Sequence, residues 1–244
     1  MKDMLKYFFR VWLAPALVTS IPLWMAVNKM SNHLCADFFE MGPSFPIHIK
    51  LLFYNSFLLA LAQFNRFISI VFQDMLHGTG LNTCAVEMVM WNNKRLLVKM
   101  KKDIHAKLLA EYGIKALSKK GEKRNKKLAR KILLRAVLKV NGKEPDPKAQ
   151  HYALEWVAVR HLIGGCITAC GILIGLLVAS IVQHNEPLIW KSAVLLVMHG
   201  IPVLFSRSIL RWFAFQYAQK FWERYVYGGN SRSFNNSKWS SLKF

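Results

Sequence analysis

Acidic residues are scarce in this sequence, and their scarcity limits the chemistry it offers. The 244 residues include 13 Asp and Glu against 34 Lys and Arg, which gives a formal net charge of +21. The acids form no cluster with histidine, so a lipid-modifying membrane enzyme is the least favoured of the functions weighed below. The excess of positive charge instead favours a polyanionic partner, either anionic lipid headgroups or nucleic acid.

Cysteine and cofactor motifs are also sparse. The four cysteines form neither a CxxC pair nor a zinc-like spacing, and no two histidines lie three or four residues apart on one predicted helix. The glycine pair of His77–Gly80 is not evidence for a phosphate-binding loop. We therefore predict no catalytic residue, no metal site and no cofactor.

Long apolar runs are present, and 53% of all residues are apolar. A membrane helix needs about 20 mostly apolar residues. In the second half of the chain, residues 161–182 and 188–205 meet this requirement, and the short connection QHNEP predicts an antiparallel hairpin. Gly200 and Pro202 are expected to kink the last span, because proline removes a backbone donor.

The first half of the chain predicts a second hairpin, with spans at about 11–27 and 47–72. The first of these runs is short and contains Pro15 and Pro22. It follows a basic start, as a secretory signal does, but lacks a small-residue cleavage site, so we interpret it as an uncleaved span. The alternative is an interfacial anchor, which would leave three spans.

The distribution of Lys and Arg predicts the orientation, because short cytoplasmic loops are enriched in them. Three precede the first span, two lie between the first two spans, and the turn between the last two has none. Residues 73–160 hold 20 Lys and Arg and eight acids, and the tail 206–244 holds seven Lys and Arg and one acid. We predict an all-α integral membrane protein with four spans and both termini in the cytoplasm. Its parts are the hairpin 1–72, a basic helical cytoplasmic insert at 73–160, the hairpin 161–205 and a basic aromatic tail.

Small residues in the third span predict close helix packing. A GxxxG pattern lets two helices approach closely in lipid, although glycine is also simply common in membrane helices. The candidate packing residues are Gly164, Gly165, Gly171 and Gly175.

Three polar residues within the spans are functional candidates, because ionisable groups are costly in a bilayer. Asn55 and Arg66 share one face of the second span with Ala62 and are expected to face protein. Arg66 is either a functional charge or a side chain that reaches the inner interface. His199 is either a proton carrier or metal ligand, or a histidine bonded to carbonyl groups that Pro202 leaves free.

The basic insert contains an amphipathic helix that ends at Asn141-Gly142. Its apolar residues repeat at helical spacing, and its cations are Lys126, Lys127, Arg130, Lys131, Arg135 and Lys139. Three interpretations compete. The helix lies on the anionic inner leaflet or packs in the cytoplasm, it docks its apolar stripe on a protein, or it binds nucleic acid. Nucleic acid is the least favoured partner, since no nucleic-acid motif is present.

These features favour a non-enzymatic subunit or accessory protein of a membrane-embedded complex, for which a secretion, conjugation or exclusion apparatus is one setting. The alternative is an ion-conducting or stator-like homo-oligomer. Flagellar stator proteins and several channel families share this topology. No motif in this sequence matches theirs, so the shared topology assigns no functional role to any residue here. The expected location is a bacterial inner membrane, or the mitochondrial inner membrane in a eukaryote.

Overall fold

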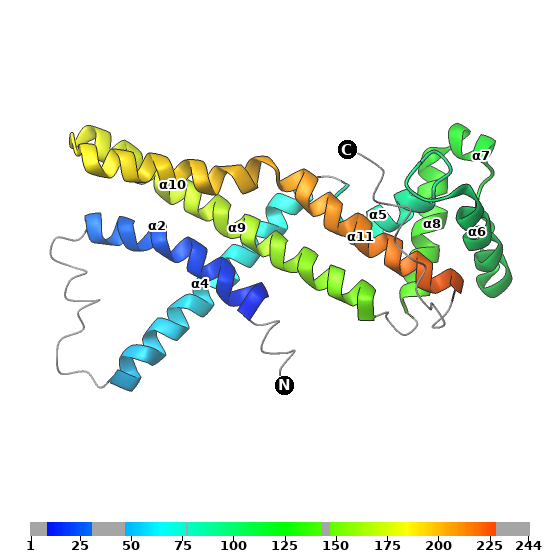
Figure 1. Cartoon of the computed structure of the whole chain (residues 1–244), viewed down its shortest axis with the longest axis horizontal. Coiled ribbons are helices and arrows are strands. Elements are labelled where there is room, and N and C mark those ends of the chain that lie inside the picture. The colour runs from blue at the N-terminus through cyan, green and yellow to red at the C-terminus, as the bar shows by residue number, and fades with distance from the viewer. Residues whose placement is uncertain (1–8, 31–46, 77, 143–146, 228–244) are drawn as a thin grey trace, which may run out of the picture. The chain divides into compact units, whose positions relative to one another are not determined.

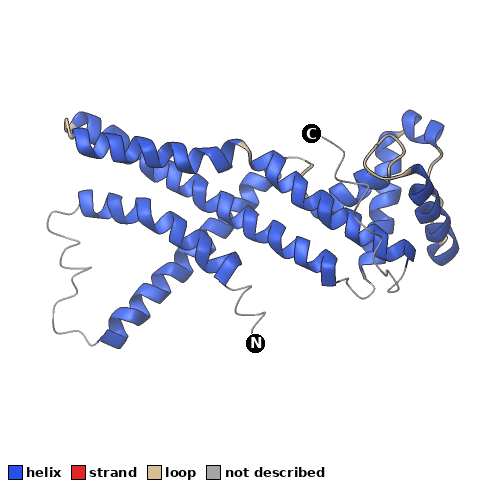
Figure 2. Cartoon of the chain, viewed as in Figure 1, coloured by secondary structure: helices blue, strands red, loops and turns tan. Residues whose placement is uncertain are grey.

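The computed structural model describes residues 9–30, 47–76, 78–142 and 147–227, and within these ranges it is helical and contains no strand (Figures 1 and 2). The elements are η1 (Phe9–Leu13), α2 (Ala14–Met30), α4 (Ile47–Met75), α5 (Leu81–Val89), α6 (Val98–Tyr112), α7 (Lys119–Arg124), α8 (Lys126–Asn141), α9 (Pro147–Val182), α10 (Glu186–Leu204) and α11 (Ser206–Tyr227). The chain divides into two compact units. Unit 1 comprises Met1–His77 and Leu154–Leu210, and unit 2 comprises Gly78–Ala153 and Arg211–Phe244.

Three helices are long and apolar enough to cross a membrane, at Asn55–Met75, Lys148–Val182 and Glu186–Leu204. They correspond to the second, third and fourth predicted spans and support an all-α membrane protein. The predicted first span lies in η1 and α2, where the apolar helix Val11–Ala26 is shorter than the other three. Four spans were predicted, and length and composition support three of them.

Helix α9 begins 14 residues before the predicted start of its span, at Pro147 rather than residue 161. The added turns carry Lys148, Glu155 and Arg160, which are good helix formers but poor lipid-facing residues. Hydropathy marks where a helix leaves lipid, whereas helix propensity decides where it ends. With 36 residues, α9 is about 54 Å long, against about 30 Å for a hydrocarbon core.

Unit 1 exposes apolar side chains on the outside of all its helices. Trp24 on α2, Phe67 on α4, Val178 on α9 and Val197 on α10 are each more than half exposed. Such a surface is unfavourable in water, since apolar area exposed to water costs free energy in proportion to its size. It suits a hydrocarbon solvent, and α2 shares this property with the three longer helices.

Helices α9 and α10 are joined by three residues, Gln183 to Asn185, and the chain reverses there (Figure 1). His184 adopts a left-handed conformation with φ of 54°. Asn185 caps α10, since its side-chain oxygen accepts from the backbone N–H of Leu188 at 3.3 Å. The short connection QHNEP thus forms the turn that the sequence predicts.

Unit 2 is a helical assembly whose core combines the basic segment with α11. The indole N–H of Trp222 donates to the carbonyl oxygen of Ala85 at 2.9 Å, and both residues are fully buried. Helix α5 also packs along α8. The sequence treats 73–160 and the tail 206–244 as separate parts. In the structure, the aromatic part of the tail up to Tyr227 belongs to the same unit as the basic segment, and residues 228–244 lie outside the described residues.

A pair of buried charges fixes the loop between α5 and α6. The ammonium group of Lys101 donates to the carbonyl oxygens of Met90 and Asn93, and burial lowers its pKa while nearby Glu122 opposes that shift. The Glu122 carboxylate accepts from the backbone N–H groups of Trp91 at 2.9 Å and Asn92 at 3.1 Å. Together the two side chains hydrogen-bond to two carbonyl oxygens and two N–H groups of the backbone that follows α5.

Candidate functional site

A buried polar contact joins three helices of unit 1. The amide nitrogen of Asn65 on α4 donates to Thr19 Oγ1 at 2.8 Å and to the carbonyl oxygen of Pro15 at 3.2 Å. The Thr19 hydroxyl has one proton and two acceptors within reach, the carbonyl oxygen of Pro15 at 3.0 Å and that of Gly165 on α9 at 3.2 Å. Asn65 and Thr19 are completely buried. Hydrogen bonds of this kind hold membrane helices in one register, because hydrocarbon offers no alternative partner.

Asn65 was not among the predicted site residues. The buried face of α4 carries Leu61, Ala62, Asn65 and Ser69, which recur at positions one helical turn apart. Serine and asparagine within an apolar run are the signal that points to this face. The sequence predicts that Asn55, Ala62 and Arg66 share a protein-facing side. Of these three residues, Ala62 is buried and the other two are exposed.

A second contact between α9 and the start of the chain lies about one helical turn from the first. The Nδ1 atom of His161 is 3.0 Å from the carbonyl oxygen of Val11, and the imidazole ring meets the edge of Trp12. Next to it, the Arg160 guanidinium donates to Gln73 Oε1 on α4 at 2.8 Å. Both contacts connect α9 to its neighbours with side chains that the sequence placed at a span end.

The four predicted packing glycines divide into two pairs. A methyl group added at Gly164 would lie 2.3 Å from the carbonyl oxygen of Asn65, and one added at Gly165 would lie 2.9 Å from that of Pro15. These two positions therefore lie at close approaches between α9 and its neighbours. Gly171 and Gly175, the GxxxG pair, have no such neighbour within 4 Å. Within this chain, the close approach falls on the Gly-Gly pair and not on the GxxxG pair.

The polar candidates on α4 lie on its exposed side. Asn55, Gln63 and Arg66 are all exposed, and we call these three residues the polar edge of α4. The guanidinium carbon of Arg66 lies 5.5 Å from the centre of the Trp12 ring. The expectation that Asn55 and Arg66 face protein is therefore not met within this chain. Helices α2 and α9 contact the adjacent side of α4, where Asn65 lies.

His199 is almost buried, and its Nδ1 atom lies 2.7 Å from the carbonyl oxygen of Leu195 on the same helix. The carbonyl group that Pro202 deprives of its usual donor belongs to Met198, four residues earlier. The histidine thus bonds within α10, but not to the carbonyl that the sequence suggested. Among the described residues, no hydrogen bond joins His199 to the polar edge of α4.

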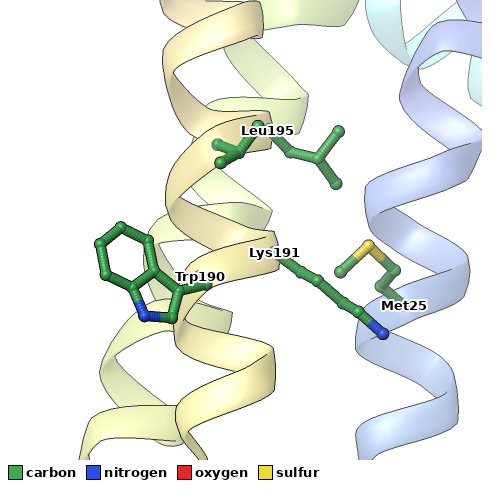
Figure 3. A pocket seen from close by; sticks show the side chains of 5 residues that line it. Met25, Trp190, Lys191 and Leu195 are labelled. Carbon is green, nitrogen blue, oxygen red and sulfur yellow. The ribbon is translucent and has the colours of Figure 1, made fainter.

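An open apolar groove of about 380 Å³ lies between α2 and α10. Its walls are the side chains of Met25, Trp190, Val194 and Leu195, together with the aliphatic part of Lys191 (Figure 3). The Lys191 side chain extends toward α2, as Figure 3 shows. The groove has no polar wall that would select a particular ligand.

The basic helix α8 has the predicted bounds at its C-terminal end and two distinct sides. Its buried side packs in unit 2 and consists of Ala129, Leu133, Ala136, Val137 and Val140. All six predicted cations are exposed. The side of α8 that carries Leu133, Val137 and Val140 is therefore occupied within unit 2, and it is not the side open to a bilayer or to another protein.

One cation of α8 takes part in a bridge that fixes the helix. Arg130 donates to Glu87 Oε1 at 3.1 Å, and Arg211 on α11 donates to Glu87 Oε2 at 3.0 Å. Glu87 on α5 thus connects α8 with α11. Among the described residues, no ion pair reaches the other five predicted cations of α8.

Three leucines accompany these cations. Leu128, Leu134 and Leu138 are 44%, 41% and 55% exposed. They recur on the side of α8 opposite the buried stripe, as helical spacing requires. We define the outer face of α8 as the three leucines with the three cations between them, Lys127, Lys131 and Arg135.

Comparison with known proteins gives no assignment. No protein-family model matches the sequence, and no curated protein and no solved structure matches it. In the described part of the chain, His, Cys, Asp and Glu side chains form no group of three or more that would hold a metal ion. The candidate functional surfaces are therefore the polar edge of α4 and the outer face of α8.

Proposed function

We propose that this chain is a non-enzymatic subunit of a membrane-embedded complex, and that the polar edge of α4 contacts a different subunit. The observation that supports this function is the exposure of Asn55, Gln63 and Arg66 along a helix long and apolar enough to span a membrane. An arginine near the centre of a span costs about 2.5–3.5 kcal/mol on the insertion scale. The contact with Trp12 and snorkelling toward an interface offset part of this cost. A partner helix that offers hydrogen-bond acceptors would offset the rest.

The partner is a different protein, because this chain has no acid to offer at that depth. Residues 11–30, 47–73, 161–182 and 187–205 contain neither Asp nor Glu. A second copy packed on the polar edge would therefore meet Arg66 with no carboxylate. A carboxylate within a span of another subunit would complement the guanidinium group.

The proposal includes four spans with both termini on the cytoplasmic side. Residues 9–30 are helical throughout, which corresponds to about 33 Å and is enough to cross a hydrocarbon core. The polar contact of Thr19 with Asn65 and Gly165 places α2 against two of the longer helices. The basic residues of unit 2 then lie on the cytoplasmic side, as the enrichment of Lys and Arg in cytoplasmic loops requires. A bacterial inner membrane is the proposed setting, in which unit 2 contacts anionic lipid or a cytoplasmic partner.

A second candidate is an ion-conducting or stator-like homo-oligomer. It is favoured by the same polar edge, which would line a hydrated path if copies of the chain surrounded it. In that arrangement the exposed Asn55 and Arg66 would face water, and His199, which was also a candidate for the path, is buried on α10.

The test is gentle extraction of a tagged full-length chain, followed by native mass determination and identification of co-purifying proteins. We expect a defined complex with at least one different subunit. Arg66→Leu should lose that subunit while the chain remains inserted, and Arg66→Lys should retain part of it. The matched control is Phe67→Leu, which alters an adjacent exposed side chain without changing charge. Purification as a closed homo-oligomer would contradict the proposal and favour conduction, to be measured next in liposomes with the Arg66 variants.

A further inference from the structure

The outer face of α8 combines two properties that together identify its ligand. Lys127, Lys131 and Arg135 provide positive charge, and no carboxylate of the described residues forms an ion pair with them. Leu128, Leu134 and Leu138 provide apolar area on the same side of the helix. A mixed leucine and lysine face is typical of helices that lie in the interfacial plane of a bilayer.

We propose that the outer face of α8 docks on the surface of an anionic bilayer, with its cations on the lipid phosphates and its leucines among the upper acyl carbons. The inference rests on the proposed function for one point only, the anchoring of this chain in a membrane. The expectation drawn from the sequence placed the basic helix as a whole on lipid or a partner, without choosing a side. Leu133, Val137 and Val140 are buried in unit 2, so the opposite side of the helix, which includes Leu128, is the one available.

The way α8 is held in unit 2 explains why this face stays outward. The buried stripe packs against α5, and Arg130 is tied to Glu87. Rolling the helix to expose its buried stripe would break both interactions. The outer face is therefore presented by a folded support and does not need to fold on binding, so docking avoids the entropic cost that a disordered basic segment would meet.

Charge and apolarity together favour a bilayer over the other polyanions. Nucleic acid is bound through phosphate contacts and base stacking, and the outer face has no aromatic side chain and places leucines where phosphates would lie. A protein partner would need an acidic surface with a matching apolar strip. An anionic bilayer supplies both, and the spans of the same chain keep it at high local concentration.

The experiment uses the full-length chain in nanodiscs made from phosphatidylcholine alone or with phosphatidylglycerol. The photoreactive residue benzoylphenylalanine replaces Leu134, and lipid adducts are measured by intact mass after illumination. The control site is Leu109 on α6, a leucine of similar exposure that lies outside the outer face of α8. We expect adducts at position 134 in discs with phosphatidylglycerol, about tenfold fewer in discs without it, and few at position 109 in either.

Two charge variants make the result specific. K127Q/K131Q/R135Q should reduce the adducts at position 134 at least tenfold, because each cation near an anionic surface contributes about a fivefold gain in binding. K99Q/K102Q/K115Q removes the same charge from other exposed sites of unit 2 and should leave the adducts unchanged. A thermal melt of each variant confirms that it is folded.

The possible outcomes separate this inference from the proposed function. Equal adducts with and without phosphatidylglycerol, or an equal loss in both triple variants, would overturn the docking of α8. A hetero-complex in which position 134 forms no lipid adduct would also overturn it, while leaving the proposed function intact. A chain that purifies without a partner but reacts with phosphatidylglycerol at position 134 would refute the proposed function and support the docking.

Discussion

Substitution of Gly164 by alanine should weaken unit 1 through a steric conflict that the structure locates atom by atom. The added methyl carbon would lie 2.3 Å from the carbonyl oxygen of Asn65, 2.7 Å from Ser69 Cβ and 3.0 Å from the Ser69 amide nitrogen. Two of these neighbours are backbone atoms of α4, so the conflict is not relieved by a side-chain rotation. Helices α4 and α9 must separate by about 1 Å, which also stretches the hydrogen bonds of Asn65.

The expected loss of stability is about 2–3 kcal/mol, within the range measured for overpacking, after a gain of up to about 1 kcal/mol from alanine over glycine in a helix. For a chain of this size, that loss corresponds to a fall of roughly 5–10 °C in the midpoint of thermal unfolding. The assay is thermal unfolding of the purified chain in mild detergent. Gly171→Ala is the matched control, since it adds the same methyl group on the same helix with no neighbour within 4 Å.

We expect Gly171→Ala to leave the midpoint unchanged or to raise it by up to about 4 °C, because alanine is the better helix former and meets no neighbour there. Equal midpoints for the Gly164 and Gly171 variants would refute the close approach of α4 and α9 at Gly164. A selective loss of a co-purifying subunit in Gly171→Ala, with stability unchanged, would instead assign the GxxxG pair to a contact with that subunit.

Three further predictions test other contacts. Thr19→Val removes the hydroxyl that accepts from Asn65 and lies within hydrogen-bond distance of the carbonyl oxygens of Pro15 and Gly165. It should cost about 1 kcal/mol in the same melt, whereas Ser20→Ala at the adjacent hydroxyl should cost less. Glu122→Gln replaces the carboxylate that accepts from the backbone N–H groups of Trp91 and Asn92 and lies near buried Lys101. The expected loss in the free energy of unfolding is about 2–3 kcal/mol. An unchanged midpoint would show that unit 2 does not need this charge. Burial lowers the pKa of His105 below its ordinary value of 6.5 in the folded chain. As the pH falls, this histidine is therefore protonated in the unfolded chain at a higher pH than in the folded chain, which favours unfolding. Stability should therefore decline between pH 7.5 and 5.5 more steeply for the wild type than for His105→Gln, and parallel slopes would contradict this.

Much of the fold follows from patterns in the sequence. Apolar runs gave the three long helices, because about 20 such residues cross a bilayer only as a helix. The basic helix ends at Asn141, where Asn141-Gly142 and the following prolines predicted its end. The predicted span begins at residue 161, whereas helix α9 begins at Pro147, because hydropathy reports on the solvent and not on the hydrogen bonds that continue the helix through Lys148 and Arg160.

The candidate sites were predicted less completely. Helical spacing showed that Asn55, Ala62 and Arg66 share one side of α4, but the direction in which that side points depends on the angle at which α2 and α9 cross it. Asn65, one residue from Arg66, is therefore buried while Arg66 is exposed. The same limit applies to the glycines, since spacing does not say which part of α9 lies at the crossing.

The sequence by itself determined the helices, the separation of apolar spans from basic segments and the two-sided pattern of α8, because these depend on local periodicity and on charge. Only the tertiary structure decided which side of each helix is covered. It placed Asn65 and the Gly164–Gly165 pair at the contact of α4 and α9, brought the aromatic residues of α11 against α5, and buried one side of α8 so that its leucine and lysine side remains exposed. These outcomes depend on packing between segments far apart in the chain, which residue spacing within one helix does not contain.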